Sequence, residues 1–196
     1  FKVDHFMNQS AHLAISCHTN NDYIIYPFVP DGSDERQYST PGFRIVTPSI
    51  HKSKYHEFNE YHTSADNLDF VSSRSLIDSL EVHKSWIGLI ESYCYPKLTN
   101  QFCEFQLGKR DLYPQIGGTL YQEAHTQNKS GTHKRLFNFK DKVKLSGAHL
   151  EAFKWLMHLA DGSISNFDIA KKSNLDIKIL NQAIAAMFQK NLLELL

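Results

Sequence analysis

The first third of the chain alternates helix-like and strand-like hydrophobic patterns. Apolar residues recur loosely at helical spacing over residues 3–16, which predicts a helix. Residues 23–29 form a β-branched and aromatic run that is typical of a buried strand ending near Pro30. Residues 31–34 then predict a loop at the end of that strand, and residues 43–46 predict a second short strand.

The strongest helical pattern in this region starts after residues 71–73, where serines offer an N-cap. One face of this helix carries apolar residues and a histidine, and it is widened by two further apolar side chains: Leu76, Leu80, His83, Ile87 and Ile90, with Ile77 and Trp86. The pattern ends near residues 93–96. Helix and strand patterns that alternate in this way indicate an α/β layered fold.

Few periodic signals occur in residues 97–145, and residues 120–144 are rich in Gln, Asn, Lys, Thr and His. A polar stretch of this kind predicts a linker or a mobile surface segment. A mild basic run in it, which ends at Lys144, is typical of a solvated face. We therefore place a first domain at residues 1–118, a linker at 119–145 and a second domain at 146–196.

The last fifty or so residues predict three short helices followed by a strand. The first helix lies around residues 150–159 and ends at Asp161-Gly162, and the second spans residues 166–172 after a Ser165 cap. Asp176 opens the third helix, on which five residues predict the buried side, and a strand follows at residues 192–196. The five residues are Ile177, Leu180, Ile184, Met187 and Phe188. This order predicts a winged helix or another helix-turn-helix domain, with a plain helical bundle as the alternative.

The overall charge argues against two classes of partner. Lys plus Arg and Asp plus Glu both number 21, so the formal net charge is zero. Generic binders of nucleic acid or of anionic membranes are usually basic. No apolar run approaches the ~20 residues of a membrane-spanning helix, and no secretory leader is recognisable at the start. The three cysteines show no CxxC spacing, so we expect reduced thiols and a cytoplasmic protein.

Two polar clusters carry residue types suited to chemistry. In residues 60–67, the neutral imidazole of His62 is able to bind zinc, and the Asp66 carboxylate is able to orient it. The same residues would also form a local turn through side-chain hydrogen bonds. In residues 31–36, which follow the first predicted strand, Asp34 or Glu35 would act as a proton shuttle or hold a substrate amine. A loop that places acids at a helix N-terminus is the alternative.

Four segments in order resemble one protein family. EYHTSADNLDFVS resembles the last zinc-ligand motif, YHTxxDx, of co-catalytic zinc aminopeptidases, and the Ser-Asp of GSDERQYSTPGF resembles the SD(H) element of the same superfamily, which includes the glutaminyl cyclases. With QLGKRDLYPQIGG and the C-terminal helices, they resemble a subfamily often named polysaccharide-biosynthesis proteins, which carry a C-terminal winged helix. The resemblance implies part of a three-layer α/β sandwich followed by a small winged-helix domain.

The resemblance also implies roles for individual residues. His62 matches the last metal-ligand histidine, and Asp66 matches the acid that supports it. Asp34 matches the acid of the SD element, which lies beside the metal in relatives, and is the candidate catalytic carboxylate. Substrate contacts are expected from four other side chains: Glu35, Arg36, Lys109 and Arg110.

Other parts of the family's metal site have no match here. The first zinc histidine, the bridging Asp and the general-base Glu all precede the matched motifs in relatives. A catalytic zinc needs about three protein ligands. We therefore expect the intact protein to hydrolyse a peptide or amide bond with zinc, and this chain alone to be inactive and to bind no zinc tightly.

Two other functions are compatible with the same motifs. One is a non-catalytic aminopeptidase-like scaffold whose winged helix binds a partner, and the other is a relative that binds carbohydrate or peptide without cleavage. The third helix of the winged-helix unit offers only Lys178 and Lys190 beside Asp176, which is a poor surface for DNA recognition. We expect the unit to pack on its own domain or on a second subunit.

Overall fold

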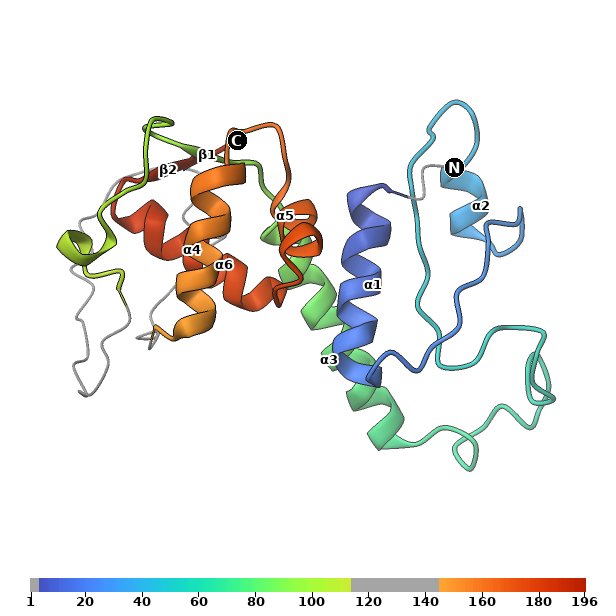
Figure 1. Cartoon of the computed structure of the whole chain (residues 1–196). Coiled ribbons are helices and arrows are strands. Elements are labelled where there is room, and N and C mark those ends of the chain that lie inside the picture. The colour runs from blue at the N-terminus through green and yellow to red at the C-terminus, as the bar shows by residue number, and fades with distance from the viewer. Residues whose placement is uncertain (1–3, 114–144) are drawn as a thin grey trace. The chain divides into compact units, whose positions relative to one another are not determined.

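The structure is a computed structural model that describes residues 4–113 and 145–196. The chain divides into two compact units, Phe1–Glu91 and Ser92–Leu196, and each is described here by itself (Figure 1). The described residues are mainly helical, and the one sheet among them has two strands. Residues 119–144 of the predicted linker at 119–145 lie outside the described residues.

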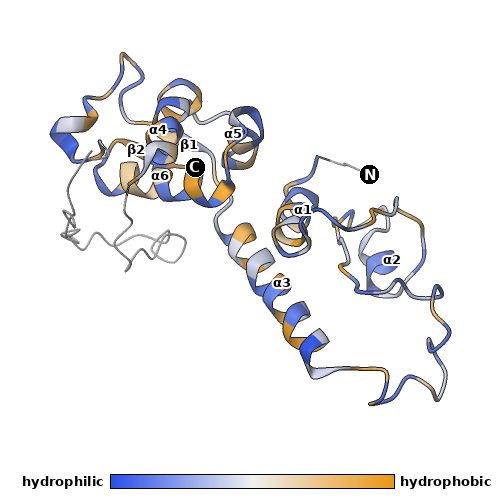
Figure 2. Ribbon diagram, turned by 60° about the horizontal axis from the view of Figure 1, so that its bottom comes forward, coloured by the Kyte–Doolittle hydropathy of each residue, from blue (hydrophilic) through white to orange (hydrophobic). Residues whose placement is uncertain are grey.

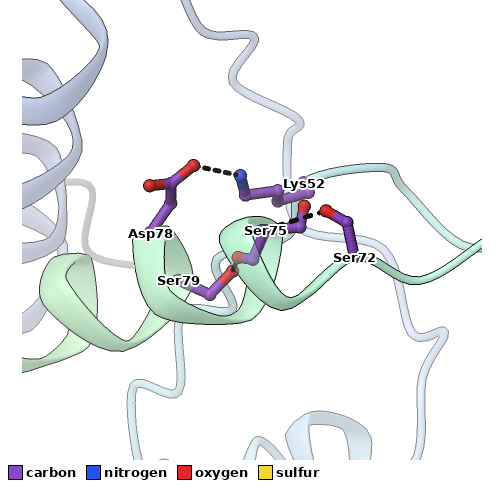
Figure 3. A network of polar contacts seen from close by, with 5 residues as sticks. All are labelled: Lys52, Ser72, Ser75, Asp78 and Ser79. Carbon is purple, nitrogen blue, oxygen red and sulfur yellow. Dashed lines mark hydrogen bonds and ion pairs between the residues drawn. The ribbon is translucent and has the colours of Figure 1, made fainter.

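The N-terminal unit is built on two packed helices, α1 (Phe6–Thr19) and α3 (Ser73–Glu91), with a short helix α2 (Asp34–Tyr38) between them in sequence. Helices were predicted at 3–16 and after 71–73, and both are confirmed, although α1 starts and ends later. The Ser72 hydroxyl accepts a hydrogen bond from the Ser75 amide at 3.1 Å, which caps α3 as the sequence indicated (Figure 3).

Small residues on α1 allow α3 to approach closely. Ser10, Ala11 and Ala14 are the buried residues of this unit, within its described part. The indole Nε1 of Trp86 donates to the Ser10 hydroxyl at 2.9 Å, and His18 Nε2 lies 2.9 Å from the Ser85 hydroxyl. The interface therefore buries no large aliphatic side chain.

The apolar face predicted for α3 packs only in part. Leu76, Leu80 and Ile87 are 61%, 57% and 59% exposed, whereas Trp86 and Ile90 of the same predicted face are half-buried. The other half-buried positions are Ser75, Ser79, Val82, Ser85 and Leu89. The pattern correctly predicted a helix, but the side of α3 that packs is shifted around the helix from the predicted face. Figure 2 shows apolar and polar residues interspersed along α3.

The two strands predicted at residues 23–29 and 43–46 are not formed within the described chain. Residues 22–29 and 44–50 run as open segments with no ladder (Figure 1). A strand needs a neighbouring strand to bond its backbone, and the described residues supply none to either segment. An ion pair of 3.2 Å between Lys52 and Asp78 joins the stretch after the second segment to α3 (Figure 3).

The C-terminal unit contains the three helices and the strand that the sequence predicted. They are α4 (Gly147–Leu159), α5 (Asn166–Ser173), α6 (Ile177–Gln189) and β2 (Leu193–Leu195). Ser165 and Asp176 cap α5 and α6 by accepting hydrogen bonds from Asp168 and Lys178 amides at 3.1 and 2.7 Å. Both predicted caps are therefore confirmed.

The three helices surround a core of large apolar side chains. Fully buried members include Phe153, Leu156, Ile169, Leu180, Ile184 and Met187. Phe188 was predicted on the buried side of α6 but is 39% exposed, because it lies next to the helix end and its neighbour Met187 fills the core. Burial on this scale stabilises the unit by roughly 1.5–3 kcal/mol for each large side chain.

Residues 92–113 join this unit through backbone pairing that the sequence did not predict. β1 (Pro96–Leu98) pairs antiparallel with β2, with Pro96 opposite Leu195 and Leu98 opposite Leu193. The 3-10 helix η1 (Leu107–Arg110) follows. The division at Glu91 and Ser92 thus lies before the domain boundaries we placed at 118 and 145, because β1 is a sheet partner of the last strand.

A buried asparagine fastens the start of this unit to α5. The Asn166 side chain accepts from the Cys94 amide at 3.2 Å and donates to the Ser92 carbonyl at 2.8 Å. Burial raises the pKa of the neighbouring Cys94 thiol to about 12, so this cysteine is a neutral core residue. All three cysteines are free thiols, as expected.

Candidate functional site

The loop that resembles the SD element is held by the Glu35 carboxylate. Glu35 Oε2 accepts from the Ser33 amide at 3.1 Å, and Oε1 accepts from the Ser49 hydroxyl at 2.6 Å. The Ser49 hydrogen bond is the largest cause of a lowered Glu35 pKa, and His51 contributes a smaller electrostatic effect in the same direction. Glu35 is therefore an ionised group that joins the loop to the second open segment.

Gly32 allows this arrangement because its backbone is left-handed and its α-carbon lies close to the carboxylate. Its φ is +80°, and a Cβ built on it would lie 2.6 Å from Glu35 Oε2. Any L-residue at position 32 would be strained and would displace Glu35. The close approach of Glu35 thus explains why glycine occupies position 32 of the GSDE motif, and this explanation requires no bound ligand.

The other two predicted residues of this loop face outward. Asp34 and Arg36 are exposed on α2, a helix of five residues. Neither side chain has a hydrogen bond or ion pair within the part of the chain that the structure describes. The loop therefore combines a fixed carboxylate, Glu35, with a neighbouring acid and a base that are accessible to a ligand.

The motif around His62 is a compact exposed turn. The His62 ring stacks on the Tyr61 ring with centroids 4.0 Å apart, and its backbone is left-handed, with φ +56°. The Thr63 hydroxyl donates to the Glu60 carbonyl at 2.9 Å and accepts from the Ala65 amide. Residues 60–65 thus form the predicted local turn, and the same turn leaves the His62 imidazole accessible.

Asp66 belongs to this turn through its backbone. Its amide donates to the Thr63 carbonyl at 3.2 Å, and its side chain is exposed. Within residues 4–113 and 145–196, no hydrogen bond or ion pair joins its carboxylate to His62. The proposed orienting role of Asp66 therefore has no contact in this structure.

An aromatic cluster bridges the two motifs. Tyr55 packs against His51 and Tyr61 with ring centroids 5.6 and 6.3 Å apart, and Tyr61 carries His62. A Cβ on Gly32 would lie 3.5 Å from the Tyr55 hydroxyl, so Tyr55 reaches the Glu35 loop. The structure thus places the two motifs on one continuous set of contacts in the N-terminal unit.

Sequence reasoning missed this cluster. Residues 51–61 are polar and aromatic with no hydrophobic period, a pattern that by itself predicts only a loop. The signal that was present is compositional, because aromatic and histidine side chains are concentrated there: His51, Tyr55, His56, Phe58 and Tyr61. Ring packing of this kind holds a loop without regular secondary structure.

A surface triad fastens the same loop to the first open segment. The Tyr26 hydroxyl donates to Glu57 Oε2 at 2.8 Å, Lys54 Nζ lies 2.8 Å from Glu57 Oε1, and Lys54 Nζ lies 4.3 Å from the Tyr26 ring centroid. The hydrogen bond to Glu57 raises the pKa of Tyr26, and the one from Lys54 lowers the pKa of Glu57. The triad is exposed, so salt will weaken it.

The remaining predicted substrate contacts, Lys109 and Arg110, lie in η1 of the C-terminal unit. Lys109 is exposed. Arg110 donates to the Gln106 carbonyl at 3.1 Å, and its guanidinium carbon lies 5.5 Å from the Phe105 ring centroid. Arg110 is thus partly engaged in its own loop, whereas Lys109 is accessible.

A large open cavity of about 1220 Å³ lies within the N-terminal unit. Its walls come from α1, α3 and both open segments, and Glu35, Ser49, His51 and Tyr55 contribute to its lining. His62 and Asp34 are not among its lining residues. The fixed carboxylate therefore faces this space, while the two residues with the strongest motif assignments lie outside it.

The donor atoms of the described residues do not complete a zinc site. No group of three or more His, Cys, Asp or Glu side chains with the spacing of a metal site occurs in the described chain. Catalytic zinc is held by about three protein ligands. His62 would be one of them, so the described residues alone do not fit the metal.

Comparisons of the sequence with known proteins find one family model and one named relative. Residues 3–93 match a family model described as a domain of unknown function, DUF4910. A Clostridium acetobutylicum protein named "Putative polysaccharide biosynthesis protein with aminopeptidase-like domain" is 34% identical over 178 residues, or 91% of this chain and 35% of the relative. The chain thus spans about a third of that relative's length.

One solved structure also matches the fold of this chain. The crystal structure of a "putative peptidase" from Clostridium acetobutylicum matches with a TM-score of 0.68 and 27% identity, over 99% of this chain and 37% of the solved one. The chain is therefore similar in sequence to a protein named for an aminopeptidase-like domain, and in fold to a solved "putative peptidase".

Proposed function

We propose that this chain is part of an aminopeptidase-like hydrolase that cleaves a peptide or amide bond. The observation that carries the proposal is the match of 99% of the chain to a solved protein titled "putative peptidase". The name of the Clostridium acetobutylicum relative favours the hydrolase over a non-catalytic scaffold. A fold match alone does not establish chemistry, so the proposal depends on the site residues.

In this proposal, zinc is bound in the complete protein by His62 together with ligands outside the described residues. An exposed imidazole on a hydrogen-bonded turn is suited to that role, and Asp66 would orient it. Asp34 would be the catalytic carboxylate. Glu35, Arg36, Lys109 and Arg110 would contact the substrate, and among these Glu35 is the one fixed in the cavity wall.

The fold assignments that accompany this function are a three-layer sandwich and a winged helix. The order α4, α5, α6 with the β1–β2 pair supports a winged helix in the C-terminal unit. We expect it to pack on its own domain or on a second subunit, and we place the protein in the cytoplasm. None of the described helices has the length and apolar character required to traverse a bilayer.

The test uses a joined protein, in which residues 1–196 replace the matched part of the Clostridium acetobutylicum relative. We expect the joined protein to hydrolyse aminoacyl p-nitroanilides and to retain zinc after dialysis, measured by elemental analysis. His62→Ala should abolish hydrolysis and weaken zinc binding by about 100-fold or more, because a ligand is lost. The matched control, His158→Ala, removes an exposed imidazole of α4 and should change neither quantity.

The 196-residue chain alone should show neither hydrolysis nor tight zinc binding. One tightly bound zinc per isolated chain would contradict the proposed ligand set. A folded joined protein without zinc and without hydrolysis would contradict the hydrolase itself and would favour the scaffold function.

A further inference from the structure

The open segment at residues 23–29 exposes apolar side chains on both of its sides. Ile24 and Ile25 are 76% and 64% exposed, and consecutive residues of an extended chain point in opposite directions. The stretch carries no charged residue. Proteins protect free strand edges with charges or with covering elements, and a strand that is apolar on both faces is typical of the interior of a layered sheet.

Three consecutive backbone amides of this segment also have no hydrogen-bond acceptor among the described residues. In the described part of the chain, no hydrogen bond reaches the amides of Ile24, Ile25 or Tyr26. Alternate residues of a strand bond to opposite neighbours. Ile25 and Pro27 therefore belong to one edge of the segment, and this edge is interrupted because Pro27 has no N–H. Ile24 and Tyr26 belong to the opposite edge, where both backbone N–H donors are present.

Other apolar side chains of the N-terminal unit are also exposed to solvent. Its buried residues, as far as the structure describes the unit, are three small ones on α1. Leu76, Leu80 and Ile87 of α3 are each more than half exposed. A unit of this size normally buries a core of large side chains. The exposed apolar surface therefore requires a partner surface of comparable extent.

The cavity beside the open segment is too large for a typical small ligand. Its volume of about 1220 Å³ exceeds the roughly 300–1,000 Å³ of ligand pockets. Many of its lining residues belong to the two open segments. A polypeptide matches this volume, and its carbonyl groups are acceptors for the free Ile24 and Tyr26 amides of the lining segment.

We infer that residues 23–29 form a sheet strand that pairs, through the Ile24 and Tyr26 edge, with a β-strand supplied by a further part of the same protein. The solved structure supports this occupant, since this chain accounts for 37% of that one and leaves ample polypeptide for a sheet. A second copy of this chain could pair through the same uncharged segment, but it contains no larger sheet among its described residues that would cover both faces of the strand. The inference does not depend on hydrolase activity.

The experiment compares residue-resolved amide hydrogen exchange in the 196-residue chain and in the joined protein. We expect the Ile24 and Tyr26 amides to exchange about 100-fold more slowly in the joined protein, because ladder bonds protect them. Ile24→Pro should abolish that protection at Tyr26. The matched control, Ile25→Pro, removes a donor from the edge already interrupted by Pro27 and should retain it.

Several outcomes would overturn the inference. Fast exchange at Ile24 and Tyr26 in a joined protein whose C-terminal unit is protected would show that no strand pairs there. Slow exchange in the isolated chain as a monomer would show that the segment needs no partner, and slow exchange only in a dimer would identify a second copy as the occupant. Loss of hydrolysis with retained protection would count against the proposed function alone.

Discussion

At the scale of single residues, Gly32 allows the Glu35 carboxylate to lie against the loop backbone. Its φ of +80° and the 2.6 Å approach to Glu35 allow the carboxylate to bond both the Ser33 amide and the Ser49 hydroxyl. The loop geometry near the candidate site therefore depends on the absence of one side chain.

We predict that Gly32→Ala destabilises the N-terminal unit by about 1–3 kcal/mol, because it strains the backbone and displaces Glu35. The measurement is urea unfolding in a Trp155→Phe background, in which the fluorescence of Trp86 reports on this unit. Gly42→Ala is the matched control, since a Cβ there meets nothing within 4 Å and φ is not positive. Equal effects of the two substitutions would contradict the steric explanation.

At the scale of elements, a buried amide joins segments distant in sequence. Asn166, the first residue of α5, bonds the backbone of residues 92 and 94 and also donates to Asn181 Oδ1 at 2.9 Å. These bonds attach the chain that leads into β1 to two helices of the core. Its position at a helix start gave no sign of this role in the sequence.

We predict that Asn166→Ala lowers the free energy of unfolding of the C-terminal unit by about 2–4 kcal/mol, because it removes the acceptor of the buried Cys94 amide and the donor to the Ser92 carbonyl. Trp155 fluorescence during urea unfolding, in a Trp86→Phe background, measures the change. Lys171→Ala, an exposed substitution on the same helix, should change stability by less than about 0.5 kcal/mol. A loss below that level for Asn166→Ala would show that water replaces its bonds.

At the scale of the whole molecule, the two units differ in how much apolar surface they bury. The C-terminal unit encloses large side chains such as Phe153 and Leu180, whereas the described N-terminal unit buries three small residues. Burial is the main favourable contribution to folding, so the units should differ in stability.

We predict that the isolated chain unfolds in two separate transitions. The Trp86 signal of the N-terminal unit should change at a lower urea concentration than the Trp155 signal of the C-terminal unit. Single-tryptophan variants separate the two signals. Coincident midpoints would show that the N-terminal unit has a stabilising contact of its own that the exposed side chains do not reveal.

Local signals in the sequence were enough for the helices and their caps. Ser72, Ser165 and Asp176 were identified from residue type and position alone, because capping bonds involve residues two or three apart. The motifs at Asp34 and His62 were likewise visible, because they are contiguous. The aromatic cluster and the Glu35–Ser49 bond were not, since they join residues that no periodic pattern relates.

The sequence by itself determined where helices begin, which motifs resemble aminopeptidases, and that residues 23–29 have the composition of a strand. Only the tertiary structure decided which face of α3 packs, that β1 pairs with β2, and that residues 23–29 find no neighbouring strand among the described residues. The physical reason is the range of the interactions. Caps and turns form within a few residues, whereas ladders and packed faces need partners whose identity depends on the chain as a whole.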